Sequence, residues 1–573
     1  MRPSAKQELS YRPYFHSFVA CRGLRDRHDG SLRVHLREGT RQSPEFELIQ
    51  GRESTNGGMA MAGQHQGNAA SWIGCTWSIL SAIILASTGA HAATYEVGDG
   101  RALTAIGDVP WETLEGGDTV LIHWREEPYR EKWVIGRTGT VDAPLVVRGV
   151  PGPSGHLPVI DGENATTRLE LDYWNEPRSV IKVGGSSVPG NVLPQYVVIE
   201  NLDVRGARPP GTFMDDAGAV QGYASNAAAI HVERGEHITI RNCIIRDSGN
   251  GLFVSSSEAE VASDILIEGN YIYGNGNVGS IFEHNAYVAG IGMVFQYNRF
   301  GPLLDGAGGN NLKDRSAGLV VRYNWIEGGN RQLDLVDGED SGLIRSDSGY
   351  DVTHVYGNVL IEEAGAGNKQ VVHYGGDSGD TSSYRNGTLH FYHNTVVSLR
   401  TDGTTLFRLS TNEHQCDARN NIVYVITGGN GLAMLDSDGV LDLSHNWFKP
   451  GWVDSFGGLA GVINDDNTTV ESSEPGFLDF GNQDFRLASG GAAVDAATAL
   501  LPAVLPEHDV TQQYAVHGMH VSRIQAGGAS DVGAFESENG ESVPVTSPYL
   551  MAILFLLVLV VMSVLQGGRK AAR

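Results

Sequence analysis

The sequence predicts an all-β chain wound into a solenoid of parallel strands. Nine times between residues 196 and 449, a short apolar-alternating run is followed by an asparagine, a second apolar run and a Gly-rich break. The asparagines lie mostly 25 to 36 residues apart, a period typical of stacked structural repeats. Because each strand is too short to bury a face alone, the coils must stack on one another. The asparagines are Asn201, Asn242, Asn270, Asn298, Asn324, Asn358, Asn394, Asn421 and Asn446.

These asparagines have a mechanical reason to recur at one place in each coil. Asn adopts the left-handed backbone conformation that a sharp turn needs, and its amide bonds to neighbouring backbone groups. Amides stacked from coil to coil form a ladder of hydrogen bonds inside the turn. The expected ladder consists of Asn242, Asn270, Asn298, Asn324, Asn358, Asn394 and Asn421.

The repeats resemble the right-handed parallel β-helix of pectate-lyase-like proteins, whose coils carry an asparagine ladder in a short turn between two strands. The resemblance covers residues 93–536 and implies a single β-helix domain. Residues 138–162 are similar to the first coil of such proteins, and residues 474–496 and 531–536 to their C-terminal cap. Since this fold includes lyases, hydrolases, epimerases and adhesins, the resemblance implies no single activity.

The two ends of the chain predict export and a membrane anchor. Residues 72–90 are apolar and lead into Ala90-His91-Ala92, which suits signal-peptidase cleavage. We therefore predict a signal peptide at 59–92, with an uncleaved anchor as the alternative, preceded by an upstream extension at 1–58. After a linker at 537–548, the uncharged run 549–565 suits a transmembrane helix, and the basic tail 566–573 places that end in the cytoplasm. The tail resembles C-terminal sorting signals of Gram-negative bacteria, which implies a cell-envelope protein with its β-helix in the periplasm or at the cell surface.

Charge and cysteine content restrict the partners. The formal net charge of −26 at pH 7 argues against nucleic acid, because phosphate binding needs a basic face. An acidic substrate would need a local basic cluster or Ca²⁺ to offset this field. Cys243 and Cys416 lie about six coils apart, roughly 29 Å at ~4.8 Å per strand, which is too far for a disulfide. Both are expected to be small core residues.

A column of outward side chains is expected on the first strand of each coil. This strand follows the Gly-rich break. Alternation sends one set of side chains inward and the other outward. In the resembling lyases this strand face is the floor of the sugar-binding groove, and the long loops 338–351 and 375–386 suit its wall. His373 is expected to be a core histidine. The predicted substrate-binding residues are His231, Phe253, His284, Tyr287, Asp334, Tyr374 and Arg408.

The densest charge cluster predicts the chemistry. Lys313 and Asp334 are 21 residues apart, so they should be neighbours on adjacent coils. Cleaving a uronic-acid polysaccharide by β-elimination needs a cation for the C5 carboxylate, a base for the C5 proton and an acid for the leaving oxygen. We predict Lys313 as the base, with Arg315 and Arg331 beside it lowering its pKa by like-charge repulsion.

This cluster resembles the chondroitinase B and alginate lyase family, which carries an Asn-x-Lys or Ser-x-Lys segment and, about one coil later, a Leu-x-Leu-Arg-His-Gly strand. Lys313 matches the lysine, and residues 333–338 match the strand, except that Val336 and Asp337 stand where the family has its Arg and His. The resemblance implies a lyase, or the related C5-epimerase, acting on an acidic polysaccharide. Because Val336 and Asp337 stand in place of that family's Arg and His, Arg315 or Arg331 would protonate the leaving oxygen instead.

Three alternatives remain open at this point. A non-catalytic, adhesin-like surface protein would bind glycan along the same groove. A glycoside hydrolase would use Asp334 with Asp337 or Glu283 as its two carboxylates. The charged turn around Lys313 is otherwise a structural feature held by ion pairs. A Ca²⁺ site is a further candidate, because hard oxygen donors cluster at Asp334, Asp337, Glu339 and Asp340.

Overall fold

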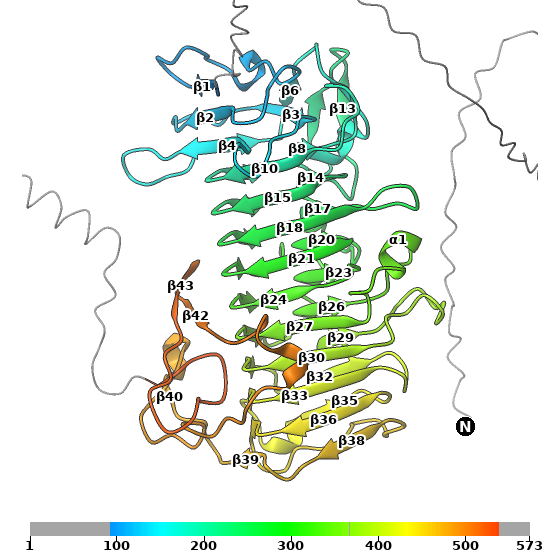
Figure 1. Ribbon diagram of the computed structural model, residues 1–573, viewed down its shortest axis with the longest axis vertical. Coiled ribbons are helices and arrows are strands. Elements are labelled where there is room, and N and C mark those ends of the chain that lie inside the picture. The colour runs from blue at the N-terminus through cyan, green and yellow to red at the C-terminus, as the bar shows by residue number, and fades with distance from the viewer. Residues whose placement is uncertain (1–91, 366, 538–573) are drawn as a thin grey trace, which may run out of the picture. The chain divides into compact units, whose positions relative to one another are not determined.

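The computed structural model describes residues 92–365 and 367–537. Nearly every strand belongs to one of three long sheets, and each coil contributes one strand to each sheet (Figure 1). Successive coils pair strand on strand in parallel, as β18, β21 and β24 do. The predicted all-β solenoid of stacked coils is therefore confirmed.

Sheet A contains β1 (Thr94–Val97), β2 (Thr119–His123), β4 (Leu145–Val150), β10 (Gln195–Glu200), β15 (Glu236–Arg241), β18 (Ala262–Glu268), β21 (Gly290–Gln296), β24 (Val320–Arg322), β27 (Val352–Tyr356), β30 (Thr388–Tyr392), β33 (Gln415–Arg419), β36 (Val440–Ser444) and β38 (Val462–Asp465). Sheet B contains β5 (Val159–Asp161), β11 (Asp203–Arg205), β16 (Ile244–Arg246), β19 (Tyr271–Tyr273), β22 (Arg299–Phe300), β25 (Trp325–Glu327), β28 (Val359–Glu362), β31 (Thr395–Ser398), β34 (Ile422–Val425), β37 (Trp447–Phe448) and β39 (Val470–Glu471).

Sheet C contains β3 (Glu131–Ile135), β6 (Ala165–Thr167), β8 (Ser179–Val183), β12 (Thr212–Met214), β13 (Val220–Gly222), β14 (Ala228–Val232), β17 (Asn250–Val254), β20 (Ala286–Val288), β23 (Leu312–Asp314), β26 (Leu333–Leu335), β29 (Gln370–Tyr374), β32 (Thr404–Leu409) and β35 (Leu432–Leu435). Three antiparallel pairs lie outside these sheets: β7 (Asp172–Tyr173) with β9 (Ser186–Val188), β40 (Phe477–Asp479) with β41 (Asp484–Leu487), and β42 (Gln512–Ala515) with β43 (Met519–Ser522). The short helices are α1 (Gly342–Arg345) and the 3₁₀ turns η1 (Ile106–Asp108), η2 (Glu176–Arg178), η3 (Gly429–Gly431), η4 (Phe480–Asn482) and η5 (Pro502–Val504).

Alternation along each strand builds one continuous core. In β18, Ile265 and Ile267 are fully buried, whereas Leu266 between them is partly exposed on the outside. Such inward side chains from all three sheets form a column from Val97 to Phe448. At roughly 25 cal/mol per Å² of buried apolar surface, this column is the main source of stability.

The asparagine ladder is present, with two differences from the prediction, at Asn242 and Asn446. Each ladder Asn except the last, Asn446, donates its side-chain N–H to the amide oxygen of the Asn one coil later, over distances of 3.0 or 3.1 Å. The left-handed position is the residue before the ladder Asn, as at Tyr323 and His393. Asn242 occupies that position and is exposed, so it lies outside the ladder, and Cys243 takes the ladder place through its backbone N–H. The ladder is Asn270, Asn298, Asn324, Asn358, Asn394, Asn421 and Asn446.

The C-terminal segment packs against the outside of sheets A and B (Figure 1). Phe485 and Phe535 join a second hydrophobic cluster around Trp325, and Val504 packs against Tyr323 and its neighbouring tyrosines. Both cysteines of the described region, Cys243 and Cys416, are free and buried, as predicted.

The predicted membrane segments lie almost entirely beyond the described residues. This applies to the upstream extension, to all of the signal peptide except Ala92, and to the transmembrane run and basic tail. Within residues 92–365 and 367–537, no helix has the length and apolar character to span a membrane.

Candidate functional site

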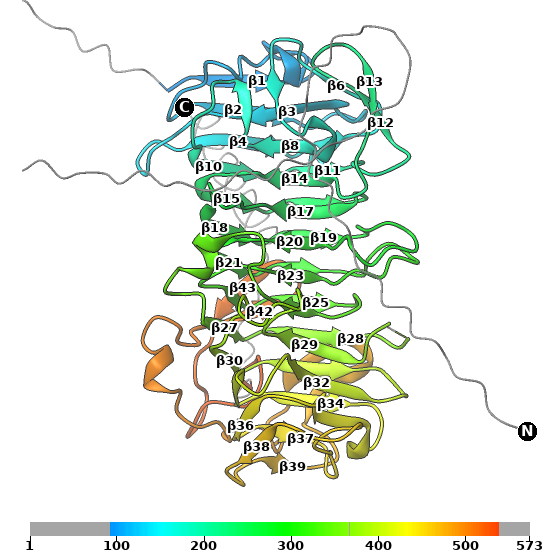
Figure 2. The same ribbon diagram turned by 90° about the vertical axis from the view of Figure 1, so that its right-hand side faces the viewer.

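The strands of sheet C stack in order from β8 to β32 (Figure 2). They present one row of outward side chains in register. Each member pairs through its backbone with the member on the next strand, and we call this set the outward row. The pairing confirms that Lys313 and Asp334 are neighbours on adjacent coils. The outward row is Lys182, His231, Phe253, Tyr287, Lys313, Asp334, His373 and Arg408.

The outward row differs from the prediction on β29. Tyr374 pairs with Leu335 and is fully buried in the core, whereas His373 pairs with Asp334. Val372 and Tyr374 fill the two inward positions of that strand. Tyr374 is therefore a core residue and not a substrate-binding one, and His373 faces the site rather than the core.

Lys313 forms the centre of the outward row. Its Nζ donates to Asp334 Oδ2 at 2.9 Å and to Asp377 Oδ2 at 2.6 Å. Its side chain is 9% exposed, so these bonds are largely shielded from water. Asp377 was not predicted, because it comes from the loop 375–386 and lies 64 residues from Lys313.

Arg315 lies beside Lys313 and shares its loop partner. Its Nη2 donates to Asp377 Oδ1 at 2.8 Å and lies 2.9 Å from Glu339 Oε1. Its Nε donates to the hydroxyl oxygen of Tyr287 at 2.9 Å. The carboxylate of Asp377 thus bridges two cations, one of which also donates to the hydroxyl oxygen of Tyr287.

Asp334 is held by four donors. Its Oδ2 accepts from Lys313 and from Asn310 Nδ2 at 2.8 Å, and its Oδ1 bonds to His373 Nδ1 at 2.8 Å. Arg331 Nη1 reaches the same Oδ1 at 3.3 Å. Burial opposes the charge, but Lys313 and His373 outweigh it and hold the pKa of Asp334 well below its usual value.

The charge state of Lys313 is opposite to the predicted one. Burial lowers its pKa, but the nearby Asp334 and Asp377 carboxylates outweigh burial and repulsion by Arg315, and the pKa is raised above 10.5. The predicted net lowering is wrong, because repulsion by Arg315 acts as expected but is outweighed by the carboxylates of Asp334 and Asp377. Lys313 therefore carries its proton in the free protein.

His284 is a buried residue that contacts two members of the site, Asn310 and Tyr287. It is 3% exposed, and burial lowers its pKa to about 3, so its ring is neutral. Its Nδ1 accepts the backbone N–H of Asn310 at 2.8 Å, and its ring stands edge-on to Tyr287 at 5.4 Å. Gly309 is needed for this approach, because a Cβ there would overlap the Glu283 carbonyl oxygen. His284 thus positions Asn310 and Tyr287.

His231 and Phe253, both predicted to bind substrate, differ in exposure. His231 is completely buried and bonds to Ser255 Oγ at 3.0 Å through Nε2, so it cannot contact a substrate as predicted. Phe253 is partly exposed and meets Tyr287 edge-on at 5.4 Å. The exposed floor therefore begins at Phe253.

The two long loops form a wall beside the site, as predicted. Loop 338–351 contains α1, and loop 375–386 supplies Asp377. Asp337 ties them together, because its Oδ1 accepts the N–H of Asp377 at 2.8 Å and its Oδ2 accepts the Ser383 hydroxyl at 2.7 Å.

The four carboxylates predicted for Ca²⁺ do not fit that role. The oxygens of Asp334 and Asp337 already accept hydrogen bonds from nitrogen and hydroxyl donors. Glu339 pairs with Arg315, and Asp340 is exposed. Among the described residues, the trio close enough to share an ion lies elsewhere, at Glu236, His237 and Asp264.

Two arginines flank the central cluster without a carboxylate partner. Within the described part of the chain, the guanidiniums of Arg178 and Arg408 make no ion pair or hydrogen bond. Arg408 ends the outward row, and Arg178 lies over the ring of Phe253 at 4.6 Å. Arg178 was missed because it precedes β8 in a 3₁₀ turn and so falls outside the repeat.

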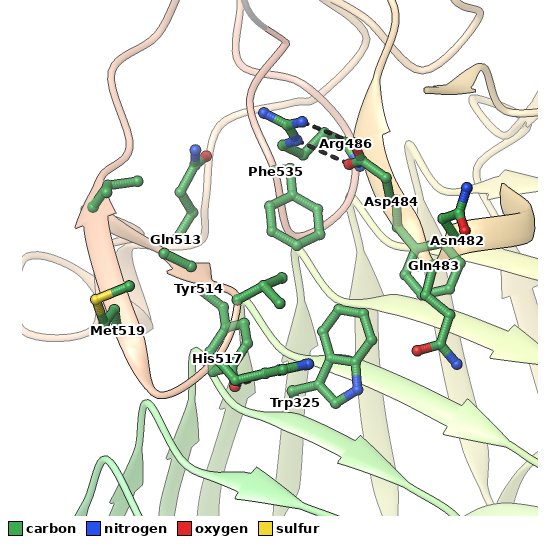
Figure 3. Close-up of a pocket in the computed structure, with 14 residues that line it drawn as sticks. Trp325, Asn482, Gln483, Asp484, Arg486, Gln513, Tyr514, His517, Met519 and Phe535 are labelled. Carbon is green, nitrogen blue, oxygen red and sulfur yellow. Dashed lines mark hydrogen bonds and ion pairs between the residues drawn. The ribbon is translucent and has the colours of Figure 1, made fainter. Parts of the chain in front are cut away.

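An apolar cavity of about 510 Å³ lies away from this site, between Trp325 and the β42–β43 hairpin (Figure 3). Its polar groups satisfy one another. Asp484 pairs with Arg486 at 2.8 Å, and the Tyr514 hydroxyl bonds to His517 Nδ1 at 3.2 Å. The cavity is a seam between the C-terminal segment and sheet B.

Comparisons with known proteins agree with the architecture. A family model described as a right-handed β-helix region matches residues 199–369, which include the Lys313 cluster. No curated protein sequence matches the chain.

Several solved structures are similar to it at low identity. Pectate lyase Pel9A shares 12% identity with a TM-score of 0.41, over 78% of this chain and 98% of that one. An alginate lyase from Paenibacillus sp. str. FPU-7 shares 14% with a TM-score of 0.35, over 59% and 94%. A GH136 lacto-N-biosidase from Eubacterium ramulus shares 12% with a TM-score of 0.34, over 65% and 68%. The family model and the three parallel sheets together make the fold a right-handed parallel β-helix.

Proposed function

We propose that this protein is a polysaccharide lyase, or a C5-epimerase of related mechanism, that binds an acidic glycan along the outward row. One observation carries the proposal: the Asp377 carboxylate bridges Lys313 Nζ and Arg315 Nη2 from a wall loop. A uronate carboxylate placed there would meet the same two cations. Asp377 is the member best able to give way, since its side chain is 33% exposed and lies on a loop.

The proton transfers follow from the charge states. Pairing of the substrate carboxylate with two cations would acidify the C5–H bond. Tyr287 is placed to take that proton as a phenolate, after its own hydroxyl proton has passed to solvent, because Arg315 donates to its oxygen and would stabilise the negative charge. As the C4–O bond breaks and the C4–C5 double bond forms, protonated Lys313 would donate to the leaving oxygen. In an epimerase, a proton would instead return to C5 from the opposite face.

The carboxylates favour this chemistry over hydrolysis. A two-carboxylate hydrolase needs one carboxyl group that holds a proton. Cationic partners keep the pKa of Asp334 low, and hydrogen bonds from Ser378, the Asp377 N–H and Ser383 do the same for Asp337. Asp334 and Asp337, one of the predicted hydrolase pairs, are therefore both ionised.

The test incubates the full-length protein with alginate, polygalacturonate, chondroitin sulfate and hyaluronan, with and without Ca²⁺, and follows the ultraviolet absorbance of the unsaturated product. The wild type should produce it from at least one polymer. Tyr287→Phe should lower kcat by about 10²–10⁴-fold, the usual contribution of a positioned acid or base. Tyr271→Phe, a half-buried tyrosine of sheet B, is the control and should keep full activity.

The other outcomes are also informative. Equal activity of the Tyr287→Phe and Tyr271→Phe variants would contradict the assignment of the C5 proton transfer to Tyr287. Glycan binding without any new product, in both the ultraviolet assay and an assay of C5 configuration by NMR, would replace the enzyme proposal with the surface-binding protein.

The proposed location is the cell envelope, with a C-terminal membrane anchor after export. The support is the apolar runs 72–90 and 549–565 and the basic tail. Fractionation of cells with and without residues 549–573 would test it, because the truncated chain should leave the membrane fraction.

A further inference from the structure

The outward face of sheet C is covered at its N-terminal end. Lys182 is fully buried there, although it belongs to the outward row. Its Nζ donates to the carbonyl oxygens of Trp174 and Gly185 and pairs with Glu233 at 2.8 Å. With His231 also buried, no glycan can lie on the floor before Phe253.

Segments inserted between the coil strands provide this cover, and together we call them the insertion. They comprise β6, the β7–β9 pair and η2 on either side of β8, and the β12–β13 pair after β11. β6, β12 and β13 lie at the N-terminal end of sheet C (Figure 2). Lys132, on β3, is 2% exposed for the same reason. Its Nζ donates to the Glu176 carbonyl oxygen at 2.8 Å and lies 3.3 Å from the centre of the Phe213 ring. The cover is a packed structural unit and therefore a fixed end wall.

The opposite end of the outward row is open. Past Arg408 lies a cavity of about 680 Å³, whose lining includes Gln370, Asp402 and Asp436. Phe456 stands at its rim with half of its surface exposed. A flat apolar ring beside polar groups suits a sugar, so a glycan has room to continue in this direction.

Arg178 is placed at the closed end. It lies over Phe253 and is partly exposed, and within the described residues its guanidinium makes no ion pair or hydrogen bond, so it is available to pair with a ligand anion. From Phe253 to Lys313 the outward row advances by two strands, or about 10 Å at ~4.8 Å per strand. Only a short end of a chain fits between the wall and the central cluster.

We propose that the covered end makes this protein act on glycan chain ends, with Arg178 binding the carboxylate of the terminal uronic acid. The inference rests on the proposed function and adds the mode of attack. A chain would enter from the Phe456 side, stop against the insertion and be cut one or two sugars from its end.

Binding stoichiometry tests this without requiring turnover. Full-length protein carrying Tyr287→Phe is titrated by calorimetry with size-fractionated oligoalginates and oligogalacturonates of increasing length. End binding predicts one protein per chain at every length. Several proteins per long chain would overturn the end-binding proposal while leaving glycan binding intact, whereas no binding to any acidic glycan would overturn the proposed function and this inference together.

Product size gives the second measurement. Wild-type protein should release only products of one or two sugars from the first minutes, while the size of the remaining polymer falls slowly on gel filtration. An early fall in polymer size with a ladder of intermediate oligosaccharides would contradict end-wise action.

Variants of Arg178 test its role. Arg178→Ala should raise KM by about tenfold or more, the usual effect of losing a hydrogen bond to a charged group, with a smaller change in kcat. Arg178→Lys should recover part of the loss. Arg208→Ala, a surface arginine near Asp247, is the control. An unchanged KM in Arg178→Ala would contradict the proposal that this residue binds the substrate.

Discussion

Asp377 occupies the position that the substrate carboxylate would take. It bonds to Lys313 and Arg315, and its backbone is held by Asp337. A carboxylate from a loop thereby gives a shared partner to two buried cations, of which Lys313 also pairs with Asp334 and Arg315 with Glu339. The same bonds make Asp377 a competitor of any acidic ligand.

The competition gives the first prediction. Asp377→Asn should raise the affinity for acidic oligosaccharides and lower KM by about threefold or more, because the two cations lose the one carboxylate that they share. Calorimetric titration with oligogalacturonate or oligoalginate, paired with steady-state kinetics, measures both. Asp142→Asn, which removes an exposed carboxylate just before β4 and outside the proposed site, is the control. Abolished activity with unchanged affinity would instead identify Asp377 as a catalytic carboxylate.

At the scale of elements, the asparagine ladder fixes how one coil sits on the next. Asn324 accepts the N–H and the side-chain amide of Asn298 at 2.9 and 3.0 Å, and donates to Phe295 O and to Asn358 Oδ1. All of these groups are buried, so a missing member leaves several of them unsatisfied.

Asn324→Ala should therefore lower the free energy of unfolding by about 2–4 kcal/mol. Asn242→Gly is the control, because Asn242 is exposed and left-handed, a conformation that glycine adopts without strain. Its effect should stay within about 0.5 kcal/mol. Chemical denaturation measures both, and equal losses in the two variants would mean that the ladder adds nothing specific.

The C-terminal segment is attached to sheet A by a stack of three imidazoles. His508 lies 3.8 Å from His354, which lies 5.2 Å from His390. The Nδ1 atoms of His354 and His508 are buried without hydrogen-bond partners, whereas that of His390 lies 3.9 Å from Asp417 Oδ2. Burial, with repulsion from the other two rings, lowers the pKa of His354 to about 3, and burial lowers that of His508. The charged groups nearest to the stack are Arg322, Glu507 and Asp417.

A third prediction concerns pH. The folded-state pKa of His354 lies below the unfolded value of 6.5. Its contribution to the free energy of unfolding is therefore complete above pH 6.5 and is lost as the pH falls toward 3. Unfolding midpoints at pH 7.5 and 5 should differ more in the wild type than in His508→Phe, which keeps a stacked ring but no titrating group. His156→Phe, at an exposed position, should behave as the wild type. Identical pH dependence in His508→Phe would contradict the role of the stack.

At the scale of the whole molecule, the sequence predicts what repeats and misses what does not. The coil period and the strand alternation are local signals, so the three sheets, the ladder and most of the outward row follow from them. The strand holding His373 was ambiguous, because apolar residues at 371, 372 and 374 fit either phase of alternation. Asn242 was misplaced because the turn has two adjacent positions that favour asparagine.

Contacts made outside the repeat could not be predicted. Asp377 reaches Lys313 through a loop, and Arg178 reaches Phe253 through an insertion, so neither follows from a period. The charge state of Lys313 depends on its contacts with two carboxylates, Asp334 and Asp377. An accurate prediction of its pKa would therefore have required the folded structure.

Mass spectrometry of the products from an acidic polysaccharide tests the central claim most directly. A lyase acting on the outward row should release unsaturated oligosaccharides that are lighter by one water molecule than hydrolysis products, and Tyr287→Phe should abolish them while Tyr271→Phe does not. Saturated products carrying an added water would identify a hydrolase and contradict the proposed elimination.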